Sequence, residues 1–137
     1  MTKLRFIFLV LIIFITCTFP IKANADHGFQ KNQLIYTQYI CFNEKSIMQL
    51  TEADVEDKNK SIMTARYLVQ LGQCGFIPKG IRMRIIKVLL DYVDYDNNKI
   101  QVIKAEAEGG MLIYTAAYRE LSHNMPYAEG TKEEIKI

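Results

Sequence analysis

The sequence contains no tryptophan and only two histidines, which narrows the chemistry that the chain can carry. His27 and His123 both lie in polar segments near the ends of the expected domain. Two histidines and an oxidised cysteine pair cannot fill the four positions of a tetrahedral zinc site. We therefore expect no metal site and no cofactor. The chain also has no internal repeat and no low-complexity segment.

An apolar run long enough to span a membrane is missing as well. The run at residues 6–19 is 14 residues long, whereas a spanning helix needs about 20. A short basic start precedes it, and Pro20 and Ala23-Asn24-Ala25 follow, which is the pattern of a secretory signal. We predict that residues 1–25 are a cleaved signal peptide and that the mature protein is periplasmic or secreted. It would meet the membrane only transiently, through this signal; retention as an anchor is the alternative.

A basic excess is absent from the predicted mature chain. Lys3, Arg5 and Lys22 leave with the signal, so 14 Lys and Arg remain against 15 Asp and Glu, a balance of −1. Bulk attraction to nucleic acid has no support from such a balance. Removal of residues 1–25 from the 137-residue chain leaves 112, which is enough for one domain.

Two of the three cysteines, Cys41 and Cys74, remain in the predicted mature chain. In an oxidising compartment an even pair predicts a disulfide. Closing a loop of about 34 residues should stabilise the fold by roughly 3–4 kcal/mol. Free thiols or an intermolecular bridge are the alternatives.

Hydrophobic periodicity predicts one strand, two helices and then three strands. A polar, flexible leader at 26–33 precedes the domain at 34–118, and a polar C-terminal tail follows at 119–137. The strands are expected at 34–41, 81–93, 99–107 and 111–118, with turns at 78–80, 94–98 and 108–110. The first helix is expected at 44–55 and the second from about Ser61 to a stop at Gly72, with a charged break at 56–60.

Two finer features belong to this pattern. The apolar stripe of the second helix is formed by Ile62, Met63, Ala65, Leu68, Val69 and Leu71. The strand at 81–93 changes the phase of its alternation at Ile85-Ile86, which predicts a bulge or sharp bend. The fold class is therefore α+β, with a small, strongly bent antiparallel sheet or partly open barrel and two short helices between the cysteines.

A family resemblance follows from the order of these features across residues 39–118. A first cysteine, two short helices, Gly72-Gln73-Cys74-Gly75-Phe76, a basic-apolar strand and then Gly110 to Tyr114-Thr115 follow one another. In this order the chain resembles small exported bacterial proteins with an SH3-like barrel and a helical insertion, most of which have no assigned function. The resemblance implies an SH3-like barrel that serves as a binding module, and it assigns no site residues.

The residue patterns in the sequence predict neither a catalytic site nor a calcium site. A cysteine paired with His123 is disfavoured because each cysteine has the other as a partner. The segment Asp94-x-Asp96-x-Asn98 copies the first three ligands of a calcium loop, but Lys99 and Ala105 replace the required Gly and Glu. We expect a solvated turn there. The strand carboxylates, Asp91, Asp94, Glu106 and Glu108, are expected at a solvated rim, so the chain is predicted not to be an enzyme.

A basic cluster and several tyrosines are the remaining candidates for binding. Lys79, Arg82, Arg84 and Lys87 form either a charged face that protects an edge strand or a landing surface for an acidic partner. Tyr95 and Tyr118 lie in and near the last turns, whereas Tyr92 and Tyr114 suit the core. We take Arg82, Arg84, Tyr95 and Tyr118 as the candidate partner-binding residues.

The predicted function is that of an exported, non-catalytic binding or adaptor module whose partner is a protein or a cell-envelope component. The alternative is a secreted inhibitor of a cell-wall-degrading enzyme such as a lysozyme, with the acidic loop at 91–96 filling a basic cleft.

Overall fold

A computed structural model describes residues 28–128. The predicted signal peptide at 1–25 and the end of the predicted tail at 129–137 lie outside the described residues. The elements are β1 (Leu34–Cys41), α2 (Glu44–Glu56), α3 (Lys58–Gln70), β2 (Cys74–Val93), β3 (Lys99–Ala107), η2 (Glu108–Gly110), β4 (Leu112–Tyr118) and η3 (Arg119–Asn124). In this part of the chain, no helix combines the length and apolar character needed to cross a bilayer.

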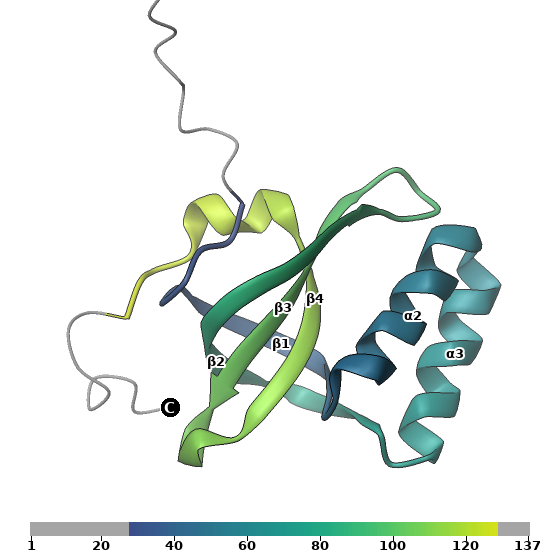
Figure 1. Cartoon of the computed structure of the whole chain (residues 1–137), viewed down its shortest axis with the longest axis horizontal. Coiled ribbons are helices and arrows are strands. Elements are labelled where there is room, and N and C mark those ends of the chain that lie inside the picture. Colours follow the sequence, from purple (N-terminus) through teal and green to yellow (C-terminus); the bar gives the residue numbers. More distant parts are fainter. Residues whose placement is uncertain (1–27, 129–137) are drawn as a thin grey trace, which may run out of the picture.

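The four strands form a closed antiparallel barrel in the order β1-β2-β3-β4, and α2 and α3 lie side by side at one end of it (Figure 1). The barrel closes where Cys41 of β1 pairs with Tyr114 of β4. Beside this pair, the Thr115 hydroxyl donates to the Tyr39 carbonyl at 2.8 Å and lies 3.1 Å from the Thr37 hydroxyl. The α+β class, the strongly bent antiparallel sheet and the two helices between the cysteines are confirmed.

The long strand β2 serves two neighbours because it bends. Its first half pairs with β1 and its second half with β3. The register with β3 shifts between Ile85 and Lys87 and again between Val88 and Leu90. These shifts confirm the break in alternation predicted at Ile85-Ile86, since an extra residue in one strand turns its side chains to the other face.

The beginning of β2 differs from the sequence prediction. The strand starts at Cys74, so the turn expected at 78–80 lies within it. Tyr39 pairs with Phe76 and Thr37 with Ile81, and the intervening residues of β2 form a bulge. Gly80 takes a φ of 74° there, a left-handed conformation that glycine adopts without steric cost. Pro78 and Gly80 are turn-forming residues that here shape a bulge, because β1 provides a pairing partner on both sides of them.

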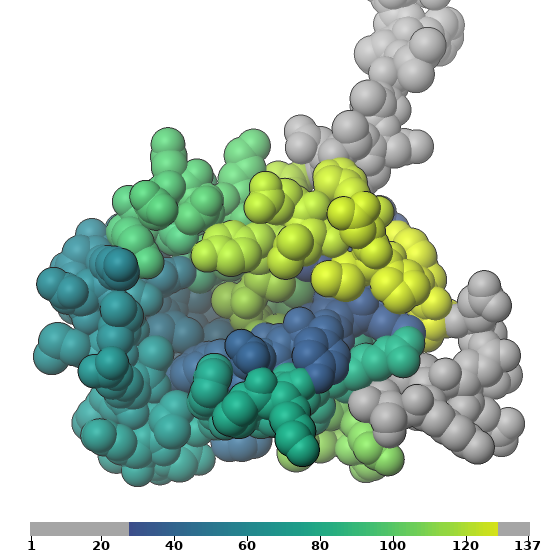
Figure 2. All heavy atoms as spheres, turned by 180° about the vertical axis from the view of Figure 1, so that it is seen from behind, coloured from purple at the N-terminus to yellow at the C-terminus, as the bar shows by residue number. Residues whose placement is uncertain are grey.

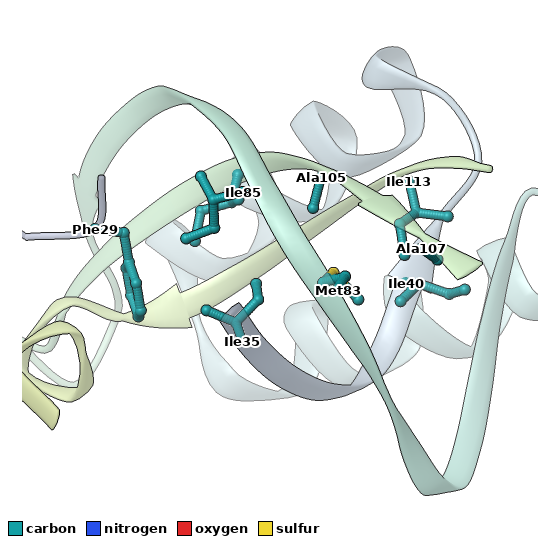
Figure 3. Close-up of a cluster of buried hydrophobic side chains, with 9 residues drawn as sticks. Phe29, Ile35, Ile40, Met83, Ile85, Ala105, Ala107 and Ile113 are labelled. Atoms are coloured by element: carbon teal, nitrogen blue, oxygen red, sulfur yellow. The ribbon is translucent and has the colours of Figure 1, made fainter. Parts of the chain in front are cut away.

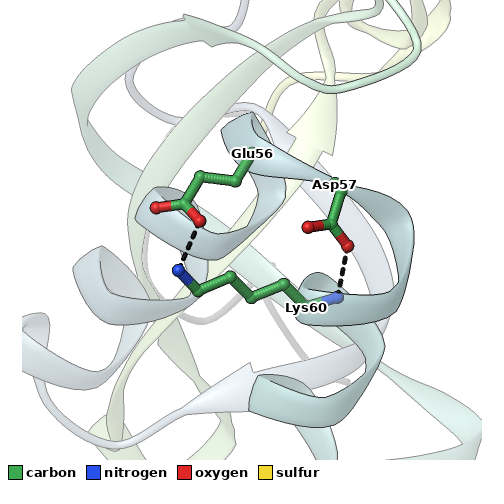
Figure 4. A network of polar contacts seen from close by, with 3 residues as sticks. All are labelled: Glu56, Asp57 and Lys60. Atoms are coloured by element: carbon green, nitrogen blue, oxygen red, sulfur yellow. Dashed lines mark hydrogen bonds and ion pairs between the residues drawn. The ribbon is translucent and has the colours of Figure 1, made fainter.

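The prediction of a charged break at 56–60 is also wrong, because a single residue separates the two helices. Asp57 has extended backbone geometry and ends α2, while its carboxylate accepts a hydrogen bond from the Lys60 backbone at 2.8 Å and caps α3. The Lys60 ammonium group pairs with Glu56 across the junction (Figure 4). The charged residues therefore start the second helix three residues earlier than Ser61.

Two apolar clusters form the core. One fills the barrel interior (Figure 3) and consists of Phe29, Ile35, Ile40, Met83, Ile85, Ile103, Ala105, Ala107 and Ile113. The other joins the helices to the barrel and consists of Cys41, Ile47, Leu68, Cys74 and Val102. Side chains therefore fill the interior of the barrel.

The described parts of the predicted leader and tail, 28–33 and 119–128, are packed and not loose. Phe29 is 3% exposed and belongs to the barrel core. Gln33 pairs with Tyr127, and its side-chain amide donates to the Ser122 carbonyl at 2.9 Å. Figure 2 shows these two segments side by side at the end of the molecule away from the helices. Polar composition misled the prediction, because these hydrogen bonds hold polar residues in place.

Candidate binding surface

The disulfide is present and closes the base of the helical hairpin. Cys41 and Cys74 are direct partners in the β1–β2 ladder, with Cα atoms 3.9 Å apart. Cys41 is fully buried, and both cysteines pack in the cluster that joins helices and barrel. Such a bond is compatible with an oxidising, extracytosolic compartment.

The two arginines predicted to bind a partner lie in different environments. Arg84 donates to the Glu106 carboxylate at 2.9 Å and to the Asn32 side chain at 2.8 Å, and its side chain is only 16% exposed. Arg82 is exposed and lies opposite Tyr36 in the ladder, with no ion pair among the described residues. Arg84 is therefore tied into the barrel wall, and Arg82 is the member of the pair that is free to contact a partner.

The two candidate tyrosines are separated from the arginines by the second half of β2. Tyr95 lies in the turn after β2 and Tyr118 at the end of β4, and they are 42% and 46% exposed. Loss of solvation, then the charges of Asp54 and Asp94, raise the pKa of Tyr95, and Tyr118 adds to the effect. The tyrosines thus share one end of the barrel, where Tyr118 also lines a polar hollow of about 340 Å³. The four predicted residues do not form one site.

The aspartate of the calcium-like segment organises the β2–β3 turn. One oxygen of the buried Asp94 accepts hydrogen bonds from the backbone amides of Asp96 and Asn98, at 2.9 and 2.8 Å. The other oxygen accepts from the Asn98 side chain at 3.1 Å. Within residues 28–128, no three potential ligands from His, Cys, Asp and Glu lie together. Both oxygens of the Asp94 carboxylate therefore accept hydrogen bonds within the turn.

The outer surface of α3 is the feature that the sequence prediction missed. Of the six apolar residues assigned to its stripe, only Leu68 is buried. Met63 is 69% exposed and Tyr67 is 52% exposed, and Ile62 and Val69 also reach the surface. A signal was available in the sequence, since apolar residues occur on all sides of this helix and one packing partner covers only one side.

An apolar groove lies between α3 and the barrel. Ile62, Ala65 and Val69 of α3 form one wall, Tyr39 of β1 and Phe76 of β2 form the other, and the volume is about 480 Å³. The aliphatic parts of Arg66 and Gln70 complete this almost entirely apolar lining.

A hydrogen bond from β1 to α3 holds the two walls of the groove together. The Tyr39 hydroxyl donates to the Ala65 carbonyl at 2.9 Å, and burial raises the pKa of Tyr39 to about 12. Phe76, by contrast, is 57% exposed. The groove thus combines walls that are held together with an apolar rim that is open to a partner.

No family model, curated protein or solved structure matches the chain. The function is therefore inferred from the residues and contacts described above.

Proposed function

We propose that this chain is an exported, non-catalytic binding or adaptor module of the periplasm or cell envelope, and that it holds its partner on the outer face of α3. The observation that carries the proposal is that very little of this helix is buried. α3 buries one residue, Leu68, and leaves Ile62, Met63, Tyr67 and Val69 exposed. Several large apolar side chains exposed on one helix are typical of interaction sites in proteins.

Export is supported by the Cys41–Cys74 bond, because such bonds persist in oxidising compartments. A small barrel with a filled interior and a helical pair inserted after its first strand also fits the SH3-like module that the sequence resembles. Because side chains fill the interior, a ligand of this barrel would be held on its outside, where the groove between α3 and β1–β2 lies.

The non-catalytic part of the proposal is supported by the use of the strand carboxylates. Glu106 pairs with Arg84, and Asp91 accepts a hydrogen bond from the Gln101 amide at 2.7 Å. Asp94 holds the β2–β3 turn. These three groups are engaged in structural contacts, which does not suit a pair that must donate and accept protons with a substrate.

The alternative, a secreted inhibitor of a wall-degrading enzyme, is favoured by a different observation. The Asp94 hydrogen bonds stiffen the β2–β3 hairpin, which projects from the barrel beside the helices (Figure 1). Tyr95 and Asp96 are exposed near its tip. A pre-organised loop with an aromatic ring and a carboxylate suits insertion into a basic cleft.

The two candidates are separated by surface variants of the mature chain, immobilised and exposed to a cell-envelope extract. Val69→Ser with Phe76→Ser should abolish retention of the partner, whereas Tyr95→Ala and the matched apolar control Leu121→Ser should keep it. All variants should melt within a few degrees of the parent, because the replaced side chains are exposed. Loss of retention in Tyr95→Ala alone would favour the inhibitor, and retention of every captured protein by the groove variant would refute the proposal.

A further inference from the structure

The part of the chain that forms the groove is strongly basic, although the mature chain as a whole is nearly neutral. Residues 58–90 contain seven Lys and Arg and no Asp or Glu. This segment comprises α3 and most of β2, the two elements on either side of the groove. Its basic residues are Lys58, Lys60, Arg66, Lys79, Arg82, Arg84 and Lys87.

Two of these seven cations are neutralised within the protein. Lys60 pairs with Glu56, and Arg84 pairs with Glu106. The other five have no ion pair among residues 28–128. Arg66 is the free cation whose aliphatic part lines the groove, and Lys79 lies three residues after Phe76 on β2. An apolar groove with unpaired positive charge beside it is complementary to a ligand that is apolar and acidic at once.

We infer that the groove binds an acidic polypeptide segment, which inserts a large apolar side chain between α3 and β2 and places a carboxylate beside Arg66. This inference rests on the proposed function and specifies its partner. The planar guanidinium group suits a carboxylate because it offers two parallel hydrogen bonds. The inserted side chain contributes by burial, since the lining offers it almost no polar contact.

A polypeptide fits the shape of this site better than a lipid surface does. The groove is open to solvent along one side, and its volume of about 480 Å³ lies within the roughly 300–1,000 Å³ typical of ligand pockets. A protein that lies on a bilayer instead inserts protruding apolar side chains below the headgroups. Arg66 of α3 and Phe76 of β2 lie on opposite walls of the groove, so one inserted segment can contact both of them.

The test uses three fluorescent peptides of equal length and the mature protein, with fluorescence anisotropy as the readout. The first peptide alternates Glu with Leu and Phe, the second has Gln in place of Glu, and the third has Ser in place of Leu and Phe. The first should bind at least tenfold more tightly than the other two, and its affinity should fall as salt is raised because screening weakens the charge contacts. Vesicles of phosphatidylglycerol and of phosphatidylcholine, followed by co-sedimentation, test the lipid alternative.

Charge reversal identifies the cation involved. Arg66→Glu should weaken binding of the acidic apolar peptide at least tenfold, whereas Lys99→Glu should change it less than twofold. Lys99 is exposed and lies outside residues 58–90, so this control alters the net charge by the same amount elsewhere on the surface. Phe76→Ser should weaken binding of the same peptide at every salt concentration, since the ring contributes buried area.

The outcomes separate this inference from the proposed function. Equal binding of the neutral apolar peptide would overturn the acidic partner while leaving the groove as a binding site. Binding to phosphatidylglycerol vesicles without binding to the acidic apolar peptide would overturn it in favour of a membrane. Failure of that peptide to bind at millimolar concentration would also overturn it. If Phe76→Ser changes neither peptide binding nor capture from the envelope extract, the proposed function fails with it.

Discussion

Asp54 connects both helices to the barrel, and its substitution should be costly. One carboxylate oxygen accepts a hydrogen bond from the Tyr92 hydroxyl of β2 at 2.7 Å, and the other accepts from the Ser61 hydroxyl of α3 at 2.9 Å. Its carbonyl accepts from the Tyr95 backbone at 2.9 Å. Burial, followed by the bond to Asp54, raises the pKa of Tyr92.

The magnitude follows from these contacts. A hydrogen bond to a charged group contributes about 1.5–3 kcal/mol, and an abandoned, partly buried hydroxyl adds a desolvation cost. Because Asp54 is partly buried, we expect Asp54→Ala to lower the free energy of unfolding by about 2–4 kcal/mol and Tyr92→Phe by about 1–2 kcal/mol. The backbone bond to Tyr95 is kept in both variants.

Urea unfolding followed by far-UV circular dichroism measures the two variants and the double variant. The double-mutant cycle should give a coupling of about 1–2 kcal/mol, because either substitution removes the same bond. Asp96→Ala is the matched control, an exposed acid in the adjacent turn, and should stay within about 0.5 kcal/mol of the parent. Additive effects of Asp54→Ala and Tyr92→Phe within about 0.3–0.5 kcal/mol would refute this role of the carboxylate.

Three further predictions concern stability. Replacing Cys41 and Cys74 together by Ala should lower the free energy of unfolding by about 3–4 kcal/mol, and an unchanged urea midpoint would contradict the structural role of the bond. Because the Tyr39 pKa is raised from 10.0 to about 12, its contribution is complete below pH 10 and lost as pH rises through 12. Tyr39→Phe should therefore flatten the fall in stability over that range by no more than about 2 kcal/mol, after allowance for its partial exposure; parallel curves would contradict this. Arg84→Ala should cost about 1–3 kcal/mol because its carboxylate partner is left half-buried, whereas Arg82→Ala should leave the melting temperature unchanged, and equal effects would contradict the difference in environment.

Most strands could be predicted from the sequence because the residues that indicate a strand lie next to one another in the chain. The β-branched and aromatic residues of 34–41 and the position of 99–107 after a turn predicted β1 and β3 with the ends that the structure shows, and the phase change at Ile85-Ile86 indicated the bend of β2. Pro78 and Gly80 misled the prediction, since the same residues form a turn in isolation and a bulge when β1 pairs beyond them. The presence of a partner strand depends on the tertiary structure and cannot be predicted from the residues around Pro78 and Gly80 alone.

The binding surface was harder to predict for a related reason. Arg82 and Arg84 share a strand face in the sequence, yet Glu106 lies opposite Arg84 in the register with β3 and takes up its charge. The groove needs β1, β2 and α3 together, and Tyr39 and Phe76 become neighbours only through the β1–β2 register that begins at the Cys41–Cys74 pair. The excess of basic residues at 58–90 can be counted in the sequence, but only the structure places these residues beside an apolar groove.

The attachment of α3 explains how its outer face remains available for a partner. The Cys41–Cys74 bond holds the helical pair at its base, and Asp54 holds its far end to β2 and α3. Between these points, the Tyr39 hydroxyl binds the Ala65 carbonyl in the middle of the helix. Since a covalent bond and polar contacts fix the helix at three places, its position does not require the outer apolar residues to be buried. The residues at the rim of the groove are therefore not the ones that hold α3 in place. Substitutions at this rim should alter binding and leave the stability of the fold nearly unchanged.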